Sequence, residues 1–448
     1  MKYIIEIKKI GNIKRNAKAV VSVPGSKSIT NRALLLAAMG DGKSYIKGAQ
    51  TSDDAKYFLE AIKTLGFEIS EEKDKLSSNL NLHIRGLGGD IPKKKEEIYV
   101  GSAGTAARFL CAMLSFSDGE YTINASEQMK SRPMAPLITS LKSTGAEITC
   151  LEKEGYLPLI IKGAGKKQKN NTIKVDIKKS SQFLSALLIA AAASKKDITI
   201  EAEGDHGMDY VYMTIRMIKV FGVDVISSES GSVKRFQIHS EGVRATDYAI
   251  EPDMSAAAYF YAMAAITNSS VTVRGIKTPS LQGDIKFLDV LEKMGAKVTN
   301  TPDGITVKGS LLPLKGGFSV DMGTYSDQAL TLSAISPYAD SPITITNIAH
   351  IALQECDRIQ AISDNLNNMG IKYEAGDDFV RIFPGDPKPA DIQTYDDHRV
   401  AMSFCLTGLM SDGIRIINPQ CCKKTFSDYF EVMDDAIKQL QEQQARSD

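Results

Sequence analysis

The chain has 448 residues, with 54 basic and 54 acidic side chains and a formal net charge of zero. At ~100–200 residues per domain, this length predicts two or three domains. The balanced charge excludes the long-range field by which polybasic proteins attract nucleic acid or anionic membranes. No stretch reaches the ~20 apolar residues of a membrane helix, so we expect no nucleic-acid or membrane partner.

The cysteines and histidines favour a reduced, cytoplasmic enzyme without a metal. The six cysteines show no CxxC spacing, and the five histidines form no HxxxH or HExxH pair. Residues Met1–Arg15 alternate basic and apolar side chains and lack the core of a signal peptide. We therefore expect no metal site and a cytoplasmic location.

A short strand pattern that ends in a turn recurs six times along the chain. Its central residues are Ile46, Ile123, Ile200, Val273, Ile345 and Ile416, which lie 77, 77, 73, 72 and 71 positions apart. Repeats of about 75 residues fill the chain and exceed the ~20–50 residues of usual solenoid repeats.

Each repeat has the same predicted parts. An apolar helix precedes the strand, at Arg32–Met39, Ala106–Ser115, Gln182–Ala193, Ser255–Ala265, Gln328–Ser336 and Arg399–Leu409. A second helix follows and ends in a capping glycine at Gly66, Gly145, Gly222, Gly295 and Gly370. Closing strands are expected at Leu82–Ile84, Leu159–Ile161, Phe236–Ile238, Ile305–Val307 and Val380–Ile382. The N-terminal strand Tyr3–Ile7 would complete the sixth repeat.

This organisation predicts an α/β fold of two domains, each an inside-out α/β barrel of three pseudo-symmetric repeats with helices inside sheets. The unit boundaries predict a continuous domain of residues 22–250 and a discontinuous one of residues 1–21 plus 251–448. We expect an active site in the cleft between them.

Polar and basic residues gather where the apolar helices begin. Ser, Thr and Asp there are ordinary N-caps, but several converging helix N-termini would also attract an anion. Basic residues beside them, in otherwise apolar surroundings, indicate a substrate with two or more anionic groups. These are Lys27, Arg32, Arg108, Arg132, Arg358, Arg399 and Lys424.

Several segments resemble one enzyme family, the 5-enolpyruvylshikimate-3-phosphate synthases (3-phosphoshikimate 1-carboxyvinyltransferases). Pro24–Arg32 reads PGSKSITNR, close to the family's PGSKSxxNR signature. Further similar segments follow in the family's order: Ala103–Thr105 with Arg108, Met129–Pro133, Ser180–Gln182, Asp396–Met402 and Lys423–Phe430.

The resemblance implies transfer of the enolpyruvyl group of phosphoenolpyruvate to the 5-hydroxyl of shikimate 3-phosphate, with release of phosphate and without a metal or redox cofactor. By position, shikimate 3-phosphate would be held by Lys27, Ser28, Arg32, Ser180, Ser181, Gln182, Tyr210, Asp327 and Gln354. Phosphoenolpyruvate would be held by Lys27, Gly104, Arg132, Gln182, Arg358, Arg399 and Lys424.

The resemblance also implies catalytic roles. Asp327 would take the 5-hydroxyl proton. Glu355 and Lys27 are candidates for protonating the methylene carbon and later removing a methyl proton, and Lys424 would stabilise the departing phosphate. The family expectation is a monomer, and Gly104 leaves room for the inhibitor glyphosate.

Five positions depart from the family pattern: Ser102, Phe109, Gly207, His350 and Gln354. Gln354 replaces a basic residue, which predicts weaker binding of shikimate 3-phosphate unless His350 or Lys130 compensates. A catalytically silent homologue that binds phosphorylated sugars is therefore one alternative. The sister transferase acting on UDP-N-acetylglucosamine is another, although the loop Ser126–Pro133 lacks its typical cysteine.

Overall fold

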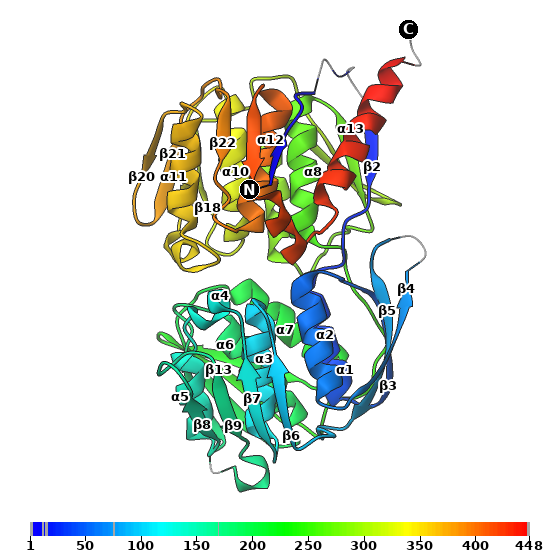
Figure 1. Cartoon of the computed structure of the whole chain (residues 1–448), viewed down its shortest axis with the longest axis vertical. Coiled ribbons are helices and arrows are strands. Elements are labelled where there is room, and N and C mark those ends of the chain that lie inside the picture. Colours follow the sequence, from blue (N-terminus) through cyan, green and yellow to red (C-terminus); the bar gives the residue numbers. More distant parts are fainter. Residues whose placement is uncertain (1–2, 11–12, 14–16, 75–76, 169, 446–448) are drawn as a thin grey trace. The chain divides into compact units, whose positions relative to one another are not determined.

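The computed structural model describes residues 3–10, 13, 17–74, 77–168 and 170–445, and in these residues the strands form six sheets (Figure 1). The sheets belong to two compact units. One is the continuous segment Gly25–Glu251, and the other combines Met1–Pro24 with Pro252–Asp448. We call them the continuous and the discontinuous unit; the predicted boundaries are 21/22 and 250/251.

The continuous unit holds three four-stranded sheets of one pattern. In each, the first two strands are parallel, and the third and fourth add antiparallel partners. The strand orders are β14(Tyr248–Ala249)-β3(Asp41–Ala49)-β5(Leu80–Leu87)-β4(Glu68–Lys73), β6(Lys95–Tyr99)-β7(Glu120–Asn124)-β9(Leu159–Lys162)-β8(Glu147–Cys150) and β10(Thr172–Asp176)-β11(Ile198–Glu203)-β13(Val233–Ile238)-β12(Val225–Ser230).

Three inner helices of this unit pack on one another: α1 (Lys27–Met39), α3 (Gly104–Phe116) and α6 (Gln182–Ala193). Each is buried on nearly all sides, as the apolar residues around its whole circumference predict. The other helices bury one face only, as their alternating polar and apolar residues predict: α2 (Asp53–Thr64), α4 (Glu127–Lys130), α5 (Ala135–Ser143) and α7 (Met208–Val220).

The discontinuous unit repeats this plan. Its sheets are β2(Lys18–Val21)-β15(Ser270–Arg274)-β17(Gly304–Lys308)-β16(Lys297–Thr301), β18(Ser319–Asp321)-β19(Ile343–Thr346)-β21(Phe379–Ile382)-β20(Tyr373–Ala375) and β1(Ile4–Glu6)-β23(Ile414–Ile417)-β22(Ala390–Ile392). Its inner helices are α8 (Met254–Thr267), α10 (Ala329–Ile335) and α12 (His398–Met410), and its outer ones are α9 (Phe287–Lys293), α11 (Arg358–Asn368) and α13 (Tyr429–Ala445).

The predicted repeat is confirmed in its main parts. All six apolar helices and all five closing strands form where expected, and the five capping glycines have positive φ angles of 70–103°. Strand β1 pairs antiparallel with β23 and completes the sixth sheet. The fifth apolar helix is less regular than predicted: 3-10 turns Ser326–Gln328 and Ser336–Tyr338 flank α10, and Pro337 prevents the α-helix from continuing.

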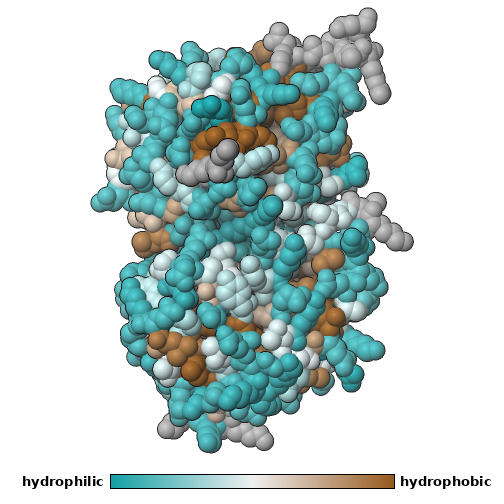
Figure 2. All heavy atoms as spheres, in the orientation of Figure 1, coloured by the Kyte–Doolittle hydropathy of each residue, from teal (hydrophilic) through white to brown (hydrophobic). Residues whose placement is uncertain are grey.

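The surface is mostly hydrophilic because the apolar inner helices are buried. On the face in Figure 2, hydrophilic side chains predominate and hydrophobic ones form separate patches. Within the ranges that the structure describes, no helix combines the length and the apolar character needed to cross a bilayer.

In three repeats, a glycine near or just after the end of the closing strand lets the chain pass against the end of an inner helix. An ideal Cβ at Gly86, Gly163 or Gly309 would lie 2.2, 2.1 or 2.1 Å from a backbone carbonyl oxygen at the end of α1, α3 or α8. Because backbone cannot swing aside as a flexible side chain can, any side chain there would push the strand off the helix.

Replacing Gly309 by alanine should therefore lower the midpoint of thermal unfolding. Overpacking against backbone costs about 1–3 kcal/mol. At ~2.1 cal/mol/K of unfolding entropy per residue, this lowers the midpoint of a 448-residue chain by about 1–3 °C. Lys308→Ala, on the neighbouring exposed residue of the same strand, is the matched control. Equal midpoints for the two variants in calorimetry would contradict this account.

Candidate active site

The inner helices of the continuous unit begin without side-chain caps. Ser26, Ala103 and Ser181 occupy the N-cap positions of α1, α3 and α6, and none of their side chains accepts a capping hydrogen bond. In the discontinuous unit, by contrast, Asp253 and Asp397 cap α8 and α12 through their carboxylates. Capping from the N-cap position therefore does not account for Ser26 and Ser181, although Ser180 Oγ accepts a hydrogen bond from the Gln182 backbone N–H at 3.3 Å. Helix N-termini of this kind suit an anion.

Arg32 is a buried cation that lacks an acidic partner in the described part of the chain. Its guanidinium donates to Thr214 Oγ1 at 2.7 Å, to the Ser28 carbonyl at 2.8 Å, to the Tyr210 carbonyl at 3.2 Å and to Ser185 Oγ at 3.4 Å. Only 2% of Arg32 is exposed. Burial among neutral groups lowers its pKa to about 10. An unneutralised buried charge is costly, so an anionic ligand would relieve it.

Gly104, the first residue of α3, allows two further guanidiniums to approach the backbone. An ideal Cβ there would lie 2.6 Å from both Arg108 Nη1 and Arg132 Nη1. Arg108 in turn donates to Gln182 Oε1 at 2.7 Å, which joins the beginnings of α3 and α6. The bare glycine thus leaves a place where a small anion can meet both arginines and backbone N–H groups.

Two other predicted residues have contacts that the sequence did not reveal. Lys27 Nζ lies 3.2 Å from Asp54 Oδ2, whose carboxylate is buried at the start of α2. Ser181 faces Gly207, where a Cβ would lie 2.6 Å from Ser181 Oγ. Since Gly207 also has a φ of 61°, a larger residue would strain the backbone at this departure from the family pattern.

Arg358 is the centre of an ion network in the discontinuous unit. Its guanidinium contacts Asp397 at 2.7 Å, Asp327 at 2.7 Å and Glu355 at 3.1 Å, and also donates to Gln354 Oε1. Only 1% of its side chain is exposed. The three carboxylates outweigh the effect of burial and raise its pKa above the ordinary value.

The remaining cations extend this network. Arg399 lies 2.8 Å from Asp327, and Lys424 lies 3.4 Å from Glu355. Burial alone would raise the pKa of Asp327, but the guanidiniums of Arg399 and Arg358 outweigh it and hold that pKa below its usual value. Asp327 is therefore a carboxylate at neutral pH.

The proposed compensation for Gln354 has no support in the contacts. His350 Nε2 lies 2.7 Å from Ser326 Oγ, and burial lowers the pKa of His350, so the imidazole is mostly neutral at pH 7. Lys130 pairs with Glu152 at 2.7 Å and with Glu127 at 3.1 Å. Phe109, a second departure, lies with its ring 5.2 Å from the Arg32 guanidinium and stabilises that charge.

Asp284 is a buried acid that the sequence reasoning missed. It lies in a 3-10 turn, accepts a hydrogen bond from Ser255 Oγ, and its other oxygen, Oδ1, has no hydrogen-bond partner in the described structure. Burial, the nearby Asp327 charge and Asp253 raise its pKa to about 7 against the opposing effect of Arg399. No spacing in the sequence marked it.

Among the described residues, no group of three or more His, Cys, Asp or Glu side chains is placed to hold a metal ion.

The comparisons with known proteins agree with this charge arrangement. The family model "EPSP synthase (3-phosphoshikimate 1-carboxyvinyltransferase)" matches residues 12–433. The chain belongs to the EPSP synthase family. A relative from Trichormus variabilis named 3-phosphoshikimate 1-carboxyvinyltransferase is 41% identical over 421 residues, 93% of this chain and 96% of the relative. One from Halalkalibacterium halodurans, 3-phosphoshikimate 1-carboxyvinyltransferase 2, is 39% identical over 92% of this chain and 91% of its own.

Solved structures show that this EPSP synthase family member also has the expected fold. The EPSP synthase of Acinetobacter baumannii superposes with a TM-score of 0.79 at 24% identity, over 97% of this chain and 98% of that one. The enolpyruvyl transferase NikO from Streptomyces tendae gives 0.74 at 16% identity, over 97% and 98%. The predicted two-domain inside-out α/β fold is thereby confirmed.

The predicted site residues of this family member fall into two groups. Lys27, Ser28, Arg32, Gly104, Arg132, Ser180, Ser181, Gln182 and Tyr210 belong to the continuous unit. Asp327, Gln354, Glu355, Arg358, Arg399 and Lys424 belong to the discontinuous unit and share the one network around Arg358.

Replacing Asp284 by asparagine should change how stability depends on pH. Because its folded pKa is about 7 and its ordinary value is 3.8, the folded state retains a proton that the unfolded chain releases between about pH 4 and 7. The wild type thus loses stability across that window, and Asp284→Asn does not. Relative to wild type, the variant should gain on the order of 1–4 kcal/mol from pH 4 to pH 7.

Urea midpoints at the two pH values measure this difference. Ser255→Ala, which retains the carboxyl but removes its hydrogen bond, should show a pH dependence at least as steep as the wild type. A parallel response of wild type and Asp284→Asn would contradict the assignment.

Proposed function

We propose that this chain transfers the enolpyruvyl group of phosphoenolpyruvate to the 5-hydroxyl of shikimate 3-phosphate and releases inorganic phosphate, in the pathway to chorismate and aromatic amino acids. The observation that carries the proposal is the family match over residues 12–433, with relatives about 40% identical that bear this activity in their names. The charge arrangement supports it, because both substrates carry a phosphate and a carboxylate.

In the continuous unit, shikimate 3-phosphate meets the beginnings of α1 and α6, where the N-cap side chains accept no capping hydrogen bond. Its phosphate or carboxylate compensates the buried Arg32 guanidinium, which lies against the Ser28 and Tyr210 carbonyls. The hydroxyls of Ser180 and Ser181 and the amide of Gln182 complete a set of hydrogen-bonding groups for an anionic sugar acid.

Phosphoenolpyruvate uses the groups around Gly104. Arg132 offers a bidentate fork to its carboxylate or phosphate, and the missing Cβ lets that group approach the backbone of α3. Lys27, Arg358, Arg399 and Lys424 supply the remaining charge.

Substrate binding changes the partners of Asp327. In the network around Arg358, the guanidiniums of Arg358 and Arg399 hold Asp327 as a weakly basic carboxylate. When these guanidiniums turn to the anionic groups of a substrate, Asp327 loses stabilising positive charge and its pKa rises. A carboxylate with a higher pKa is the better general base, so binding itself would activate the proton acceptor.

The reaction then proceeds by addition and elimination. Asp327 takes the proton of the 5-hydroxyl while the oxygen of that hydroxyl bonds to C2 of phosphoenolpyruvate. C3 of phosphoenolpyruvate receives a proton from Glu355 or Lys27 and becomes a methyl group. Loss of a methyl proton to the same acid restores the double bond as the C2–O bond to phosphate breaks. Lys424 stabilises the departing phosphate.

The two groups of site residues lie in different units. Since one reaction uses both groups, they must act on the same pair of substrates, in the interdomain cleft expected from the sequence. A cytoplasmic monomer, as the resemblance implies, is part of the same proposal.

Phosphate release from phosphoenolpyruvate, measured with and without shikimate 3-phosphate and with mass detection of the enolpyruvyl product, tests the function. Release should require both substrates. Asp327→Asn should lower turnover by a factor of about 10²–10⁴, while Asp303→Asn, in an exposed hairpin turn, should not change it.

Two results would contradict these assignments. Calorimetric binding of either substrate without any release would indicate a silent homologue. Full turnover of Asp327→Asn with both substrates bound would show that another group accepts the proton.

Replacing Gln354 by lysine tests the most pronounced departure. An ammonium beside the carboxylates of Asp327 and Glu355 restores the basic residue usual in the family, so the Kd of shikimate 3-phosphate should fall about three- to tenfold. Gln354→Met is the control: like lysine, methionine lacks the amide that contacts Arg358, but it adds no charge. The difference between the two variants is therefore the effect of the charge. An unchanged Kd in Gln354→Lys would show that charge at this position does not determine affinity.

A further inference from the structure

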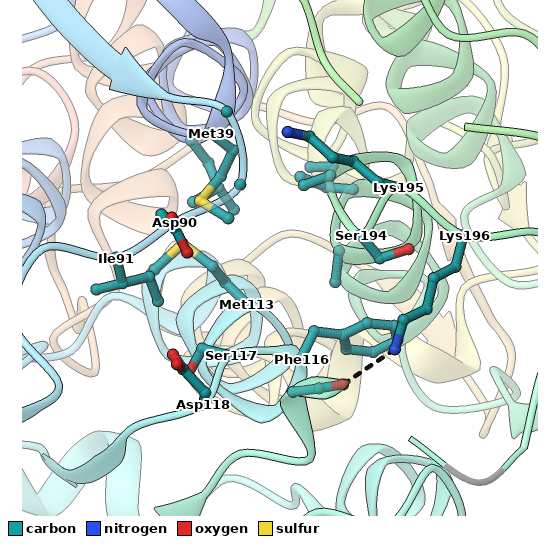
Figure 3. A pocket seen from close by; sticks show the side chains of 17 residues that line it. Met39, Asp90, Ile91, Met113, Phe116, Ser117, Asp118, Ser194, Lys195 and Lys196 are labelled. Carbon is teal, nitrogen blue, oxygen red and sulfur yellow. Dashed lines mark hydrogen bonds between the residues drawn. The ribbon is translucent and has the colours of Figure 1, made fainter. Parts of the chain in front are cut away.

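A pocket of about 280 Å³ opens in the continuous unit where its three inner helices end. Leu35 and Met39 of α1, Met113 and Phe116 of α3, and Ile189 of α6 supply apolar walls (Figure 3). The volume equals that of roughly nine water molecules at ~30 Å³ each. It suits one small molecule with an apolar body.

The pocket is remote from the candidate active site within the same unit. Lys27, Gly104 and Gln182 open α1, α3 and α6, whereas the pocket lies at the opposite ends of these helices. The pocket lining begins at Leu35, Met113 and Ile189 and continues to the helix ends, so at 1.5 Å per residue it lies about 10–20 Å along the helices from their first residues. The substrates proposed above therefore do not account for the pocket.

Charges of opposite sign line two sides of the pocket. Asp90 and Asp118 lie on one side, and Lys195 and Lys196 on the other (Figure 3). Gly89 fixes the wall that bears Asp90, because its Cα lies so close to the end of α6 that a Cβ would be 2.8 Å from the Ala193 carbonyl oxygen.

Neither lysine has a carboxylate partner within the described ranges. Lys196 Nζ donates to the Gly165 carbonyl at 2.9 Å and to Gln168 Oε1 at 3.0 Å, both of them neutral. Lys195 makes no hydrogen bond or ion pair there, and its Nζ lies 3.3 Å from where a Cβ of Gly88 would be. The ammonium groups can thus receive a ligand carboxylate without first breaking a salt bridge.

The opposite side favours a positive group. Three helix C-termini meet at the pocket, each equivalent to about half a negative charge. Asp90 and Asp118 add to this, although Lys94 contacts both, at 3.8 and 2.6 Å. The carbonyl ends of the helices would repel a ligand that carries only negative charge. Lys195 and Lys196 would repel a ligand that carries only positive charge.

We propose that this pocket binds a small zwitterion with an apolar body, of the class of α-amino acids with a large apolar side chain. The side chain lies among Met39, Met113 and Phe116, the carboxylate meets Lys195 and Lys196, and the ammonium group meets Asp90 and the helix ends. The proposal is independent of the function proposed above.

Binding of L-phenylalanine to the full chain, followed by calorimetry and by saturation-transfer NMR, tests the proposal. Saturable binding with one site per chain is expected, and it should persist when phosphoenolpyruvate and shikimate 3-phosphate are both present. 3-Phenylpropionate, which lacks the ammonium group, and 2-phenylethylamine, which lacks the carboxylate, should each bind at least fivefold more weakly.

Variants locate the site. Lys195→Asn should weaken L-phenylalanine at least fivefold, and asparagine tolerates the positive φ of 56° at this position. Lys174→Asn, on an exposed strand residue of the same unit, is the control. Ala190→Leu, which fills the pocket from α6, should abolish binding, with the thermal midpoint as the check of folding.

Three outcomes would overturn the proposal: no saturation by L-phenylalanine at millimolar concentration, equal affinity for either singly charged analogue, or affinity that Lys195→Asn leaves unchanged. Phosphate release reads the active site separately, so failure here would leave the proposed function intact.

Discussion

The burial of three helices inside each unit is the constraint on which the other features depend. α8 is buried at every one of its 14 residues, and α1, α3 and α6 are buried over nearly their whole length. Helices of this kind hold few polar groups along their sides, because an unpaired polar group in such surroundings is costly. The charged residues that could bind a ligand therefore gather at the helix ends.

The two units meet this constraint with different electrostatics. In the continuous unit, Arg32 is surrounded by neutral oxygen atoms and an aromatic ring, so its charge remains uncompensated. In the discontinuous unit, Arg358 is compensated by three carboxylates. The first arrangement attracts an anion directly, whereas the second must exchange internal partners when an anion arrives.

Much of the fold could be predicted because each part of the repeat has its own local sequence pattern. The strand patterns, the apolar helices and the glycines at 66, 145, 222, 295 and 370 each occupy positions that backbone conformation demands. Even the closure of the sixth sheet by β1 followed from the missing strand of the last repeat. The apolar pattern did not predict the irregular ends of α10. Pro337 accounts for the turn after α10, and no signal in the sequence marks the turn Ser326–Gln328 before it.

The sequence predicted which residues belong to the candidate site but not how they pair with one another. The residues at the helix beginnings and the resemblance predicted the basic and acidic members. They did not predict that Lys27 pairs with Asp54, nor that Asp327, Glu355 and Asp397 all meet at Arg358. Such pairings are set by tertiary packing between residues distant in sequence. Asp284 and the pocket at the ends of α1, α3 and α6 depend on packing in the same way.

The pairing of β1 with β23 has a consequence for how the chain acquires its structure. Ile4 lies opposite Ile417, and Lys18–Val21 forms a sheet with Ser270–Arg274. During synthesis the continuous unit is complete once Glu251 has emerged, so it can fold while the ribosome is still at work. Strand β2 can pair once β15 has emerged, but β1 stays unpaired until β23, which lies far later in the chain, has been made. Strand β1 is thus made before the continuous unit but finds its place after it, and the unpaired edges that it presents meanwhile are open to association with other chains.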